Sequence, residues 1–90
     1  MDAGDWVTVE LFGVPRLRAG TARARVRPGT LGAILAALEE HFPRLGKLTA
    51  GARLSPHYLA SLDGDVFLAD LDAELPAGSK LLLLSADAGG

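Results

Sequence analysis

The residues with the clearest chemical potential come last in the sequence, where Ala88 is followed by Gly89 and Gly90. Glycine has no Cβ, so the last two backbone units are thin and conformationally free. A free terminal carboxylate on such a segment could enter a narrow channel in another protein. The glycine pair alone also fits an ordinary frayed terminus, so its meaning depends on the rest of the chain.

The other reactive side chains form no catalytic or metal-binding motif. His41 and His57 stand without a second histidine or a cysteine at ligand spacing, and we expect capping or surface roles for them. Ser55 lies near His57, but no third residue or oxyanion donor is indicated, which argues against a hydrolase. Five acidic residues lack the spacing of a calcium loop and are typical of turns and solvated faces: Asp63, Asp65, Asp70, Asp72 and Glu74.

Composition limits the class of protein. The 90 residues, 49% hydrophobic and 22% charged, predict a single globular domain. A net charge of −2 argues against a nucleic-acid partner, and the lack of cysteine excludes disulfides and a thiol nucleophile on this chain. Residues 1–5 lack an apolar signal segment, and the longest aliphatic run, residues 81–84, is too short to cross a membrane. We therefore expect a cytoplasmic protein that does not bind membranes.

Two strands are predicted near the start of the chain, because apolar and polar residues alternate over residues 6–12 and 21–27. The segment 13–20, with Pro15 and two glycines, is predicted to be a long hairpin loop between them. Five basic side chains are expected to form a charged outer face, which either protects a sheet edge from pairing or docks an acidic partner. They are Arg16, Arg18, Arg23, Arg25 and Arg27, and the last three face outward on the second strand.

An α-helix is predicted next, with Thr30 as its N-cap and Pro43 ending it. Its apolar stripe has helical spacing and consists of Leu31, Ile34, Leu35, Leu38 and Phe42. Segment 44–56 shows no sustained period and is predicted to be a connecting loop with room for a short helical turn.

Three strands are predicted in the remainder, over residues 58–62, 65–68 and 80–84, with Asp63-Gly64 as a turn between the first two. The order β-β-α-β-β-β is typical of an α+β domain with one helix against one sheet. The first and last strands can then lie side by side and parallel at the centre of the sheet.

The last strand is apolar on both faces. Leu81 and Leu83 would face one side of the sheet, and Leu82 and Leu84 the other, yet one helix covers only one side. Either loop residues shield the second pair, or the pair forms an exposed apolar patch for a partner protein, which Phe12 could join.

Taken together, these features resemble the small sulfur-carrier proteins of the β-grasp fold, the MoaD and ThiS group related to ubiquitin. The resemblance spans residues 7–90 and is carried by the segment 7–13, the helix start at Thr30, the Asp63-Gly64 turn and the segments 75–81 and 88–90. It implies a ubiquitin-like β-grasp domain over residues 1–84, with a mixed four- to five-stranded sheet on one main helix, and a flexible Gly-Gly tail over residues 85–90. The length and the long first loop are more similar to the small subunit of molybdopterin synthase than to the thiamine carrier.

The resemblance also implies a reaction at Gly90. An E1-like adenylating enzyme of the MoeB/ThiF type would use ATP to adenylate the Gly90 carboxylate, and sulfur from a persulfide donor would displace AMP to leave a thiocarboxylate. That sulfur would be delivered inside the large, MoaE-type subunit of molybdopterin synthase, with Gly89 and Gly90 narrow enough to enter its channel. The carrier would supply no general base and bind no cofactor or metal, and Leu84, with Leu82 and Phe12, would dock on the partners.

Three other functions fit the same sequence. The carrier could serve thiamine thiazole formation or another sulfur-requiring pathway. A ubiquitin-like modifier would instead form isopeptide bonds with lysines through Gly90. In a simple binding module, the Gly-Gly end would be incidental.

Overall fold

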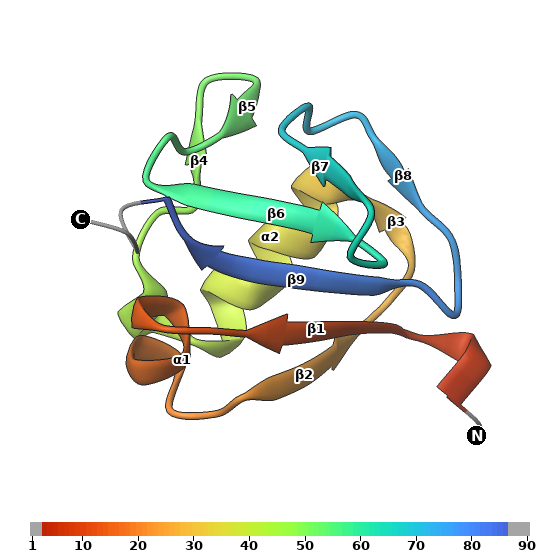
Figure 1. Cartoon of the computed structure of the whole chain (residues 1–90), viewed down its shortest axis with the longest axis horizontal. Coiled ribbons are helices and arrows are strands. Elements are labelled where there is room, and N and C mark those ends of the chain that lie inside the picture. Colours follow the sequence, from red (N-terminus) through yellow and green to blue (C-terminus); the bar gives the residue numbers. More distant parts are fainter. Residues whose placement is uncertain (1–2, 87–90) are drawn as a thin grey trace.

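The computed structural model describes residues 3–86, which form a five-stranded mixed sheet with one long helix packed on one face (Figure 1). The predicted α+β architecture is therefore confirmed. In chain order the strands of this sheet are β1 (Val7–Leu11), β2 (Arg23–Val26), β6 (Tyr58–Leu62), β7 (Val66–Leu68) and β9 (Lys80–Ser85).

The last strand lies at the centre of the sheet, whose order is β2-β1-β9-β6-β7 (Figure 1). Strand β9 is parallel to β1, with Leu81 opposite Val9, and antiparallel to β6, with Leu84 opposite Leu59. The predicted parallel pairing of the first and last strands is thus confirmed. Strands β2 and β7 form the two edges.

Helix α2 (Leu31–His41) crosses one face of the sheet. Its N-cap is Thr30, as predicted, and the Thr30 hydroxyl accepts a hydrogen bond from the Ala33 N–H at 3.1 Å. The helix ends at His41, because Phe42 leaves helical geometry and Pro43 follows. Four predicted stripe residues are buried in the helix, Leu31, Ile34, Leu35 and Leu38, whereas Phe42 is only partly buried at its end.

The core lies between this helix and the inner face of the sheet. The sheet contributes the alternate residues of its two central strands, and a long loop adds further leucines. The largest fully buried side chains from outside the helix are Val7, Val9, Leu11, Leu45, Leu48, Leu75, Leu81 and Leu83.

Residues 13–20 connect two antiparallel strands, as in the predicted hairpin, but the prediction that they form a loop is wrong, because they contain a short helix, α1 (Val14–Ala19). Gly13 has a positive φ of 59°, and its carbonyl accepts the first helical hydrogen bond, from Leu17 N–H at 3.1 Å. Gly20 closes the other end in the left-handed conformation and donates to the Arg16 carbonyl at 3.0 Å. The two glycines mark the ends of a helix rather than a flexible loop.

The connecting segments hold more structure than the sequence predicts. The expected helical turn after α2 is present as a 3-10 turn at Pro43–Leu45, but the rest of segment 44–56 contains a two-stranded hairpin rather than loop alone. A second small sheet ties the start of α2 to the loop before β9, and another 3-10 turn precedes β1. These elements are β4 (Thr49–Ala50), β5 (Arg53–Leu54), β3 (Gly29–Thr30), β8 (Glu74–Leu75) and the turn at Ala3–Asp5.

The predicted turn at Asp63-Gly64 is confirmed. Both residues have positive φ, 53° and 80°, and the Asp65 N–H donates to the Leu62 carbonyl at 3.0 Å, as in a type I′ hairpin turn. The fourth predicted strand starts one residue later than expected, at Val66. Across residues 3–86, no helix has both the length and the hydropathy needed to span a bilayer.

Candidate functional site

The end of strand β9 positions the segment that leads to the predicted reactive residues. The strand includes Ser85, the first residue of the predicted tail, and the Ala86 N–H donates to the His57 carbonyl at 2.9 Å. The chain is therefore held beside the start of β6 as far as Ala86. Gly89 and Gly90 lie outside the described residues, so their roles stay predictions.

The face of the sheet opposite helix α2 carries the predicted apolar side chains. Leu81 and Leu83 are fully buried against the helix, whereas Leu82 and Leu84, which point the other way, are only half-buried. Phe12 follows β1 on the same uncovered side and is 45% exposed. Its N–H donates to the Leu83 carbonyl at 3.0 Å, which fixes it beside the end of β9. The two-faced character of the last strand is thereby confirmed.

Two further apolar residues extend this face, and we call the whole group the outer patch. Leu59 lies directly opposite Leu84 across the β6–β9 ladder and is 38% exposed. Phe67, 69% exposed, is paired with Ser61, which is in turn paired with Leu82. Ser61 itself is buried, so its larger neighbours cover it. The outer patch therefore consists of Phe12, Leu59, Phe67, Leu82 and Leu84.

Sequence reasoning missed Leu59 and Phe67 as members of the outer patch. The signal was present, because Leu59 alternates with the buried Tyr58 and Ala60 in a predicted strand. The sequence does not reveal the register between β6 and β9, which places Leu59 directly opposite Leu84.

A charged cluster borders the outer patch on the β1–β2 side. One Glu10 carboxylate oxygen lies 3.2 Å from an Arg23 guanidinium nitrogen and 3.8 Å from the Lys80 ammonium nitrogen. Arg23 and Lys80 are more than half exposed, so each pair contributes little to stability. The cluster instead gives the apolar surface a polar rim, as is usual for protein interfaces.

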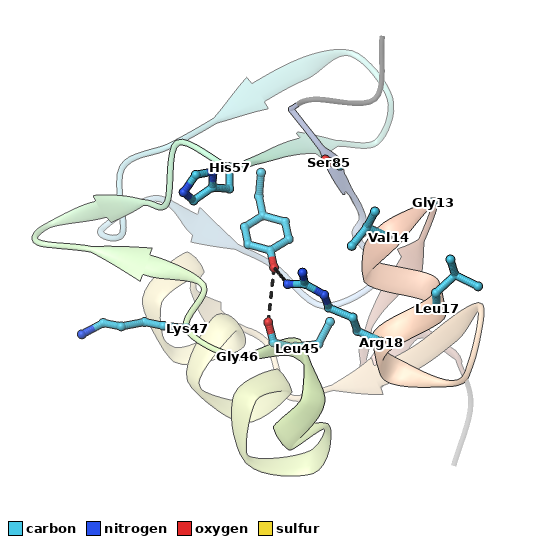
Figure 2. A pocket seen from close by; sticks show the side chains of 10 residues that line it. Gly13, Val14, Leu17, Arg18, Leu45, Gly46, Lys47, His57 and Ser85 are labelled. Atoms are coloured by element: carbon cyan, nitrogen blue, oxygen red, sulfur yellow. Dashed lines mark hydrogen bonds between the residues drawn. The ribbon is translucent and has the colours of Figure 1, made fainter. Parts of the chain in front are cut away.

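A cavity of about 730 Å³ lies where β1 and β9 end, next to the outer patch (Figure 2). Inside it, the Arg18 guanidinium donates to the Tyr58 hydroxyl at 3.3 Å, and that hydroxyl donates to the Leu45 carbonyl at 3.2 Å. These bonds join α1, β6 and the turn after α2. Figure 2 shows Lys47 directed away from this cluster. The other lining residues are Gly13, Val14, Leu17, Gly46, His57 and Ser85.

The remaining candidate groups have local roles. The buried Ser55 hydroxyl accepts a hydrogen bond from the His57 N–H at 3.3 Å, which orders the turn before β6. Asp63 and Asp70 each accept a backbone N–H, from Lys80 and Asp72, as turn residues do. Within residues 3–86, no group of three or more histidine, aspartate or glutamate side chains could hold a metal ion.

Comparison with known proteins identifies structural neighbours for this fold. No family model matches the sequence, and no curated protein matches it. SAMP1 from Haloferax volcanii is 27% identical, with 94% of this chain and 99% of that chain covered and a TM-score of 0.77. A chain of the BexX/CysO complex from Amycolatopsis orientalis has a TM-score of 0.79 at 24% identity, covering 93% and 99%.

A third neighbour is a putative molybdopterin converting factor, subunit 1, from Pyrococcus furiosus. It is 14% identical and has a TM-score of 0.73, with 89% of this chain and 95% of that chain covered. At this identity the likeness shows the fold alone. The structural neighbours of this chain are thus ubiquitin-fold proteins of the MoaD/ThiS kind, and they support the resemblance found in its sequence.

Proposed function

We propose that this chain is a cytoplasmic sulfur carrier that works through the carboxylate of Gly90. The carboxylate is a poor electrophile because its charge is delocalised by resonance. Attack of this carboxylate on the α-phosphate of ATP, in an E1-like partner, releases pyrophosphate and forms an acyl-adenylate. A persulfide on a donor protein then attacks the acyl carbon and displaces AMP, which gives an acyl disulfide. A second thiol attacks the donor's sulfur in that disulfide, so that a new disulfide forms and a thiocarboxylate is left at Gly90.

The observation that carries this proposal is the outer patch beside the end of β9. The half-buried Leu84 lies six residues before Gly90, and it is flanked by exposed Phe12 and Leu59. A partner protein that binds the outer patch would therefore have the C-terminal residues of this chain next to its binding surface. Gly89 and Gly90 add no side chains that would obstruct a narrow channel.

The recipient of the sulfur is proposed to be the precursor of molybdopterin, bound by a MoaE-type large subunit. The sequence resemblance to the small subunit of molybdopterin synthase supports this pathway. In this proposal the carrier contributes delivery and docking rather than a catalytic base.

The second candidate is a protein modifier that forms isopeptide bonds through Gly90. The neighbour SAMP1 favours it, because that protein is described as a small archaeal modifier protein and 99% of its chain is covered. Both functions begin with adenylation of Gly90 and differ in the nucleophile that follows, which is sulfur in one case and a lysine amine in the other.

Intact-mass spectrometry tests the proposal directly. The protein is incubated with ATP, a persulfide donor, a thiol reductant and a MoeB/ThiF-type enzyme, and we expect the mass gain for exchange of one oxygen by sulfur. A variant lacking Gly89 and Gly90 is the control and should gain nothing. If the full chain also gains nothing with any activating enzyme of its source cell, the proposal fails.

Two cellular assays separate the pathways. Complementation of molybdoenzyme activity by the full chain, but not by the truncated control, supports delivery to molybdopterin. A ladder of higher-mass adducts in a lysate blot, lost in the same truncation, supports the modifier.

A further inference from the structure

The free edge of strand β2 has the features of a peptide-binding site. Strand β2 pairs only with β1, so its other side is an open sheet edge. In an antiparallel ladder, residues alternate between bonding to the neighbour and pointing away from it. The Leu11 N–H bonds to the Ala22 carbonyl, and the Thr8 N–H bonds to Ser79 on the β9 side. This alternation directs the backbone N–H and C=O of Arg23 and Arg25 outward, away from β1.

At the start of β2, the outward backbone groups of the edge already have a hydrogen-bond partner within the chain. The Thr21 hydroxyl donates to the Arg23 carbonyl at 3.2 Å and accepts from the Arg23 N–H at 3.4 Å. The open part of the edge is therefore centred on Arg25. Within residues 3–86 no strand pairs with it.

A groove of about 430 Å³ runs under this edge, between β2 and the end of helix α2. Ala24 and Val26 point to this inner side, and Phe42 and His41 form its other wall. The groove lies where the helix ends at His41, and Val26 at the end of β2 is buried in the core. Its lining is mixed, because Arg23 and Arg25 border it together with the apolar Ala24 and Phe42. The groove therefore offers room beneath the edge for the side chains of an added strand.

The opposite side of the edge is basic. Arg23 and Arg25 point to the outer face, and Arg27 is exposed just beyond the strand. Arg23 is paired with Glu10, but no ion pair is formed by Arg25 or Arg27 within the described part of the chain. Among the residues that the structure describes, none that lines the groove is acidic.

We propose that the β2 edge binds an extended segment of a partner protein in which apolar and acidic residues alternate. The segment would add a strand beside β2 through the backbone of Arg25. Its apolar side chains would fill the groove against Ala24 and Phe42, and its acidic side chains would meet Arg23, Arg25 and Arg27. This site lies on an edge strand and is independent of the chemistry proposed for Gly90.

The probe for this site is a short fluorescent peptide in which valine and aspartate alternate, with capped ends. Binding to the full chain is followed by anisotropy, and its location by amide chemical shifts. We expect shifts centred on Arg25 and Phe42, and no binding of a peptide in which lysine replaces aspartate.

Single substitutions distinguish the contribution of the basic side chains from that of the outward backbone N–H. Arg25→Glu should weaken binding about tenfold or more, because an attractive pair becomes repulsive. The matched control is Arg53→Glu, an equal charge change at an exposed residue of β5, which should change affinity less than about twofold. Arg25→Pro should bind about fivefold more weakly than Arg25→Ala, because only the proline removes the outward N–H.

Three results would overturn the proposal. The first is equal weakening by Arg25→Glu and Arg53→Glu, which would indicate nonspecific charge attraction. The second is a set of shifts centred on Phe12 and Leu84 rather than on Arg25. The third is concentration-dependent dimerisation that is lost in Arg25→Pro, which would assign the edge to a second copy of this chain.

Discussion

Leu59 and Leu84 lie directly opposite each other on adjacent antiparallel strands, and both point to the face of the sheet that helix α2 does not cover. Residues paired in this way are in side-chain contact range, so the two leucines act as one apolar surface. Because Leu84 is also the last leucine before the tail, a change at this pair tests docking with little effect on the core.

Leu84→Asp should leave the fold intact and weaken binding to a MoeB/ThiF-type enzyme or a MoaE-type large subunit by at least about tenfold, since a buried carboxylate has no partner in an apolar interface. Calorimetric titration measures the affinity, and circular dichroism checks the fold. Val66→Asp is a matched control, because Val66 is 53% exposed but lies outside the outer patch. An unchanged affinity for Leu84→Asp would remove this residue from the interface.

Adjacent leucines of β9 should differ sharply in their contribution to stability. Leu83 is fully buried, so Leu83→Ala should lower the free energy of unfolding by about 2–5 kcal/mol. Leu82 is half-buried on the other face, so Leu82→Ala should cost about 1 kcal/mol. Urea denaturation of both variants measures the difference. Equal losses would show that the outer face is packed as tightly as the core.

Asp63 links the β6–β7 turn to the central strand. Its carboxylate accepts the Lys80 N–H at 2.8 Å while its backbone adopts a φ of 53°. Asp63→Ala loses this bond and places alanine in the left-handed region, so the free energy of unfolding should fall by about 1–3 kcal/mol. Asp63→Asn retains an acceptor and tolerates the same backbone, and should cost clearly less. Thermal unfolding compares the two, and a greater loss in the asparagine variant would contradict this account.

The hydroxyl of Tyr58 joins Arg18 of α1 to the Leu45 carbonyl. Tyr58→Phe should lower the free energy of unfolding by about 1 kcal/mol, because it leaves the Leu45 carbonyl without that donor. A double-mutant cycle with Arg18→Ala isolates the bond between the two side chains. Strict additivity of the two single changes would show that the 3.3 Å contact contributes nothing.

The main elements were predictable because burial repeats at the period of each element. In β1, Val7, Val9 and Leu11 are buried while Thr8 and Glu10 are not, and this alternation is visible in the residue types. Helix α2 was equally clear, since Thr30 is a suitable cap and the leucines follow at helical spacing.

Helix α1 was missed because six residues are too few to show a period. Pro15 favours a loop when read with the two glycines, although proline is also common in the first turn of a helix. The spacing of Gly13 and Gly20 holds the missed signal, since one glycine starts the helix and the other caps it.

For the candidate site, the sequence predicted which residues of β9 are exposed but not what surrounds them. Leu82, Leu84 and Phe12 could be assigned to the uncovered face from alternation alone. Leu59 and Phe67 join them only through strand register, which depends on pairing between distant segments. The groove under β2 likewise depends on where α2 ends relative to the sheet.

The central position of β9 has a mechanical consequence. This strand forms four residue pairs with β1 and five with β6, and it is the last strand of the described residues. A force applied to the carboxyl end would load these bonds in shear, so that they must break together rather than one after another. An unfolding machine that pulls on the carboxyl end would have to break the pairing of β9, the most resistant part of the domain, first. An enzyme that only binds the C-terminal residues would leave the domain folded.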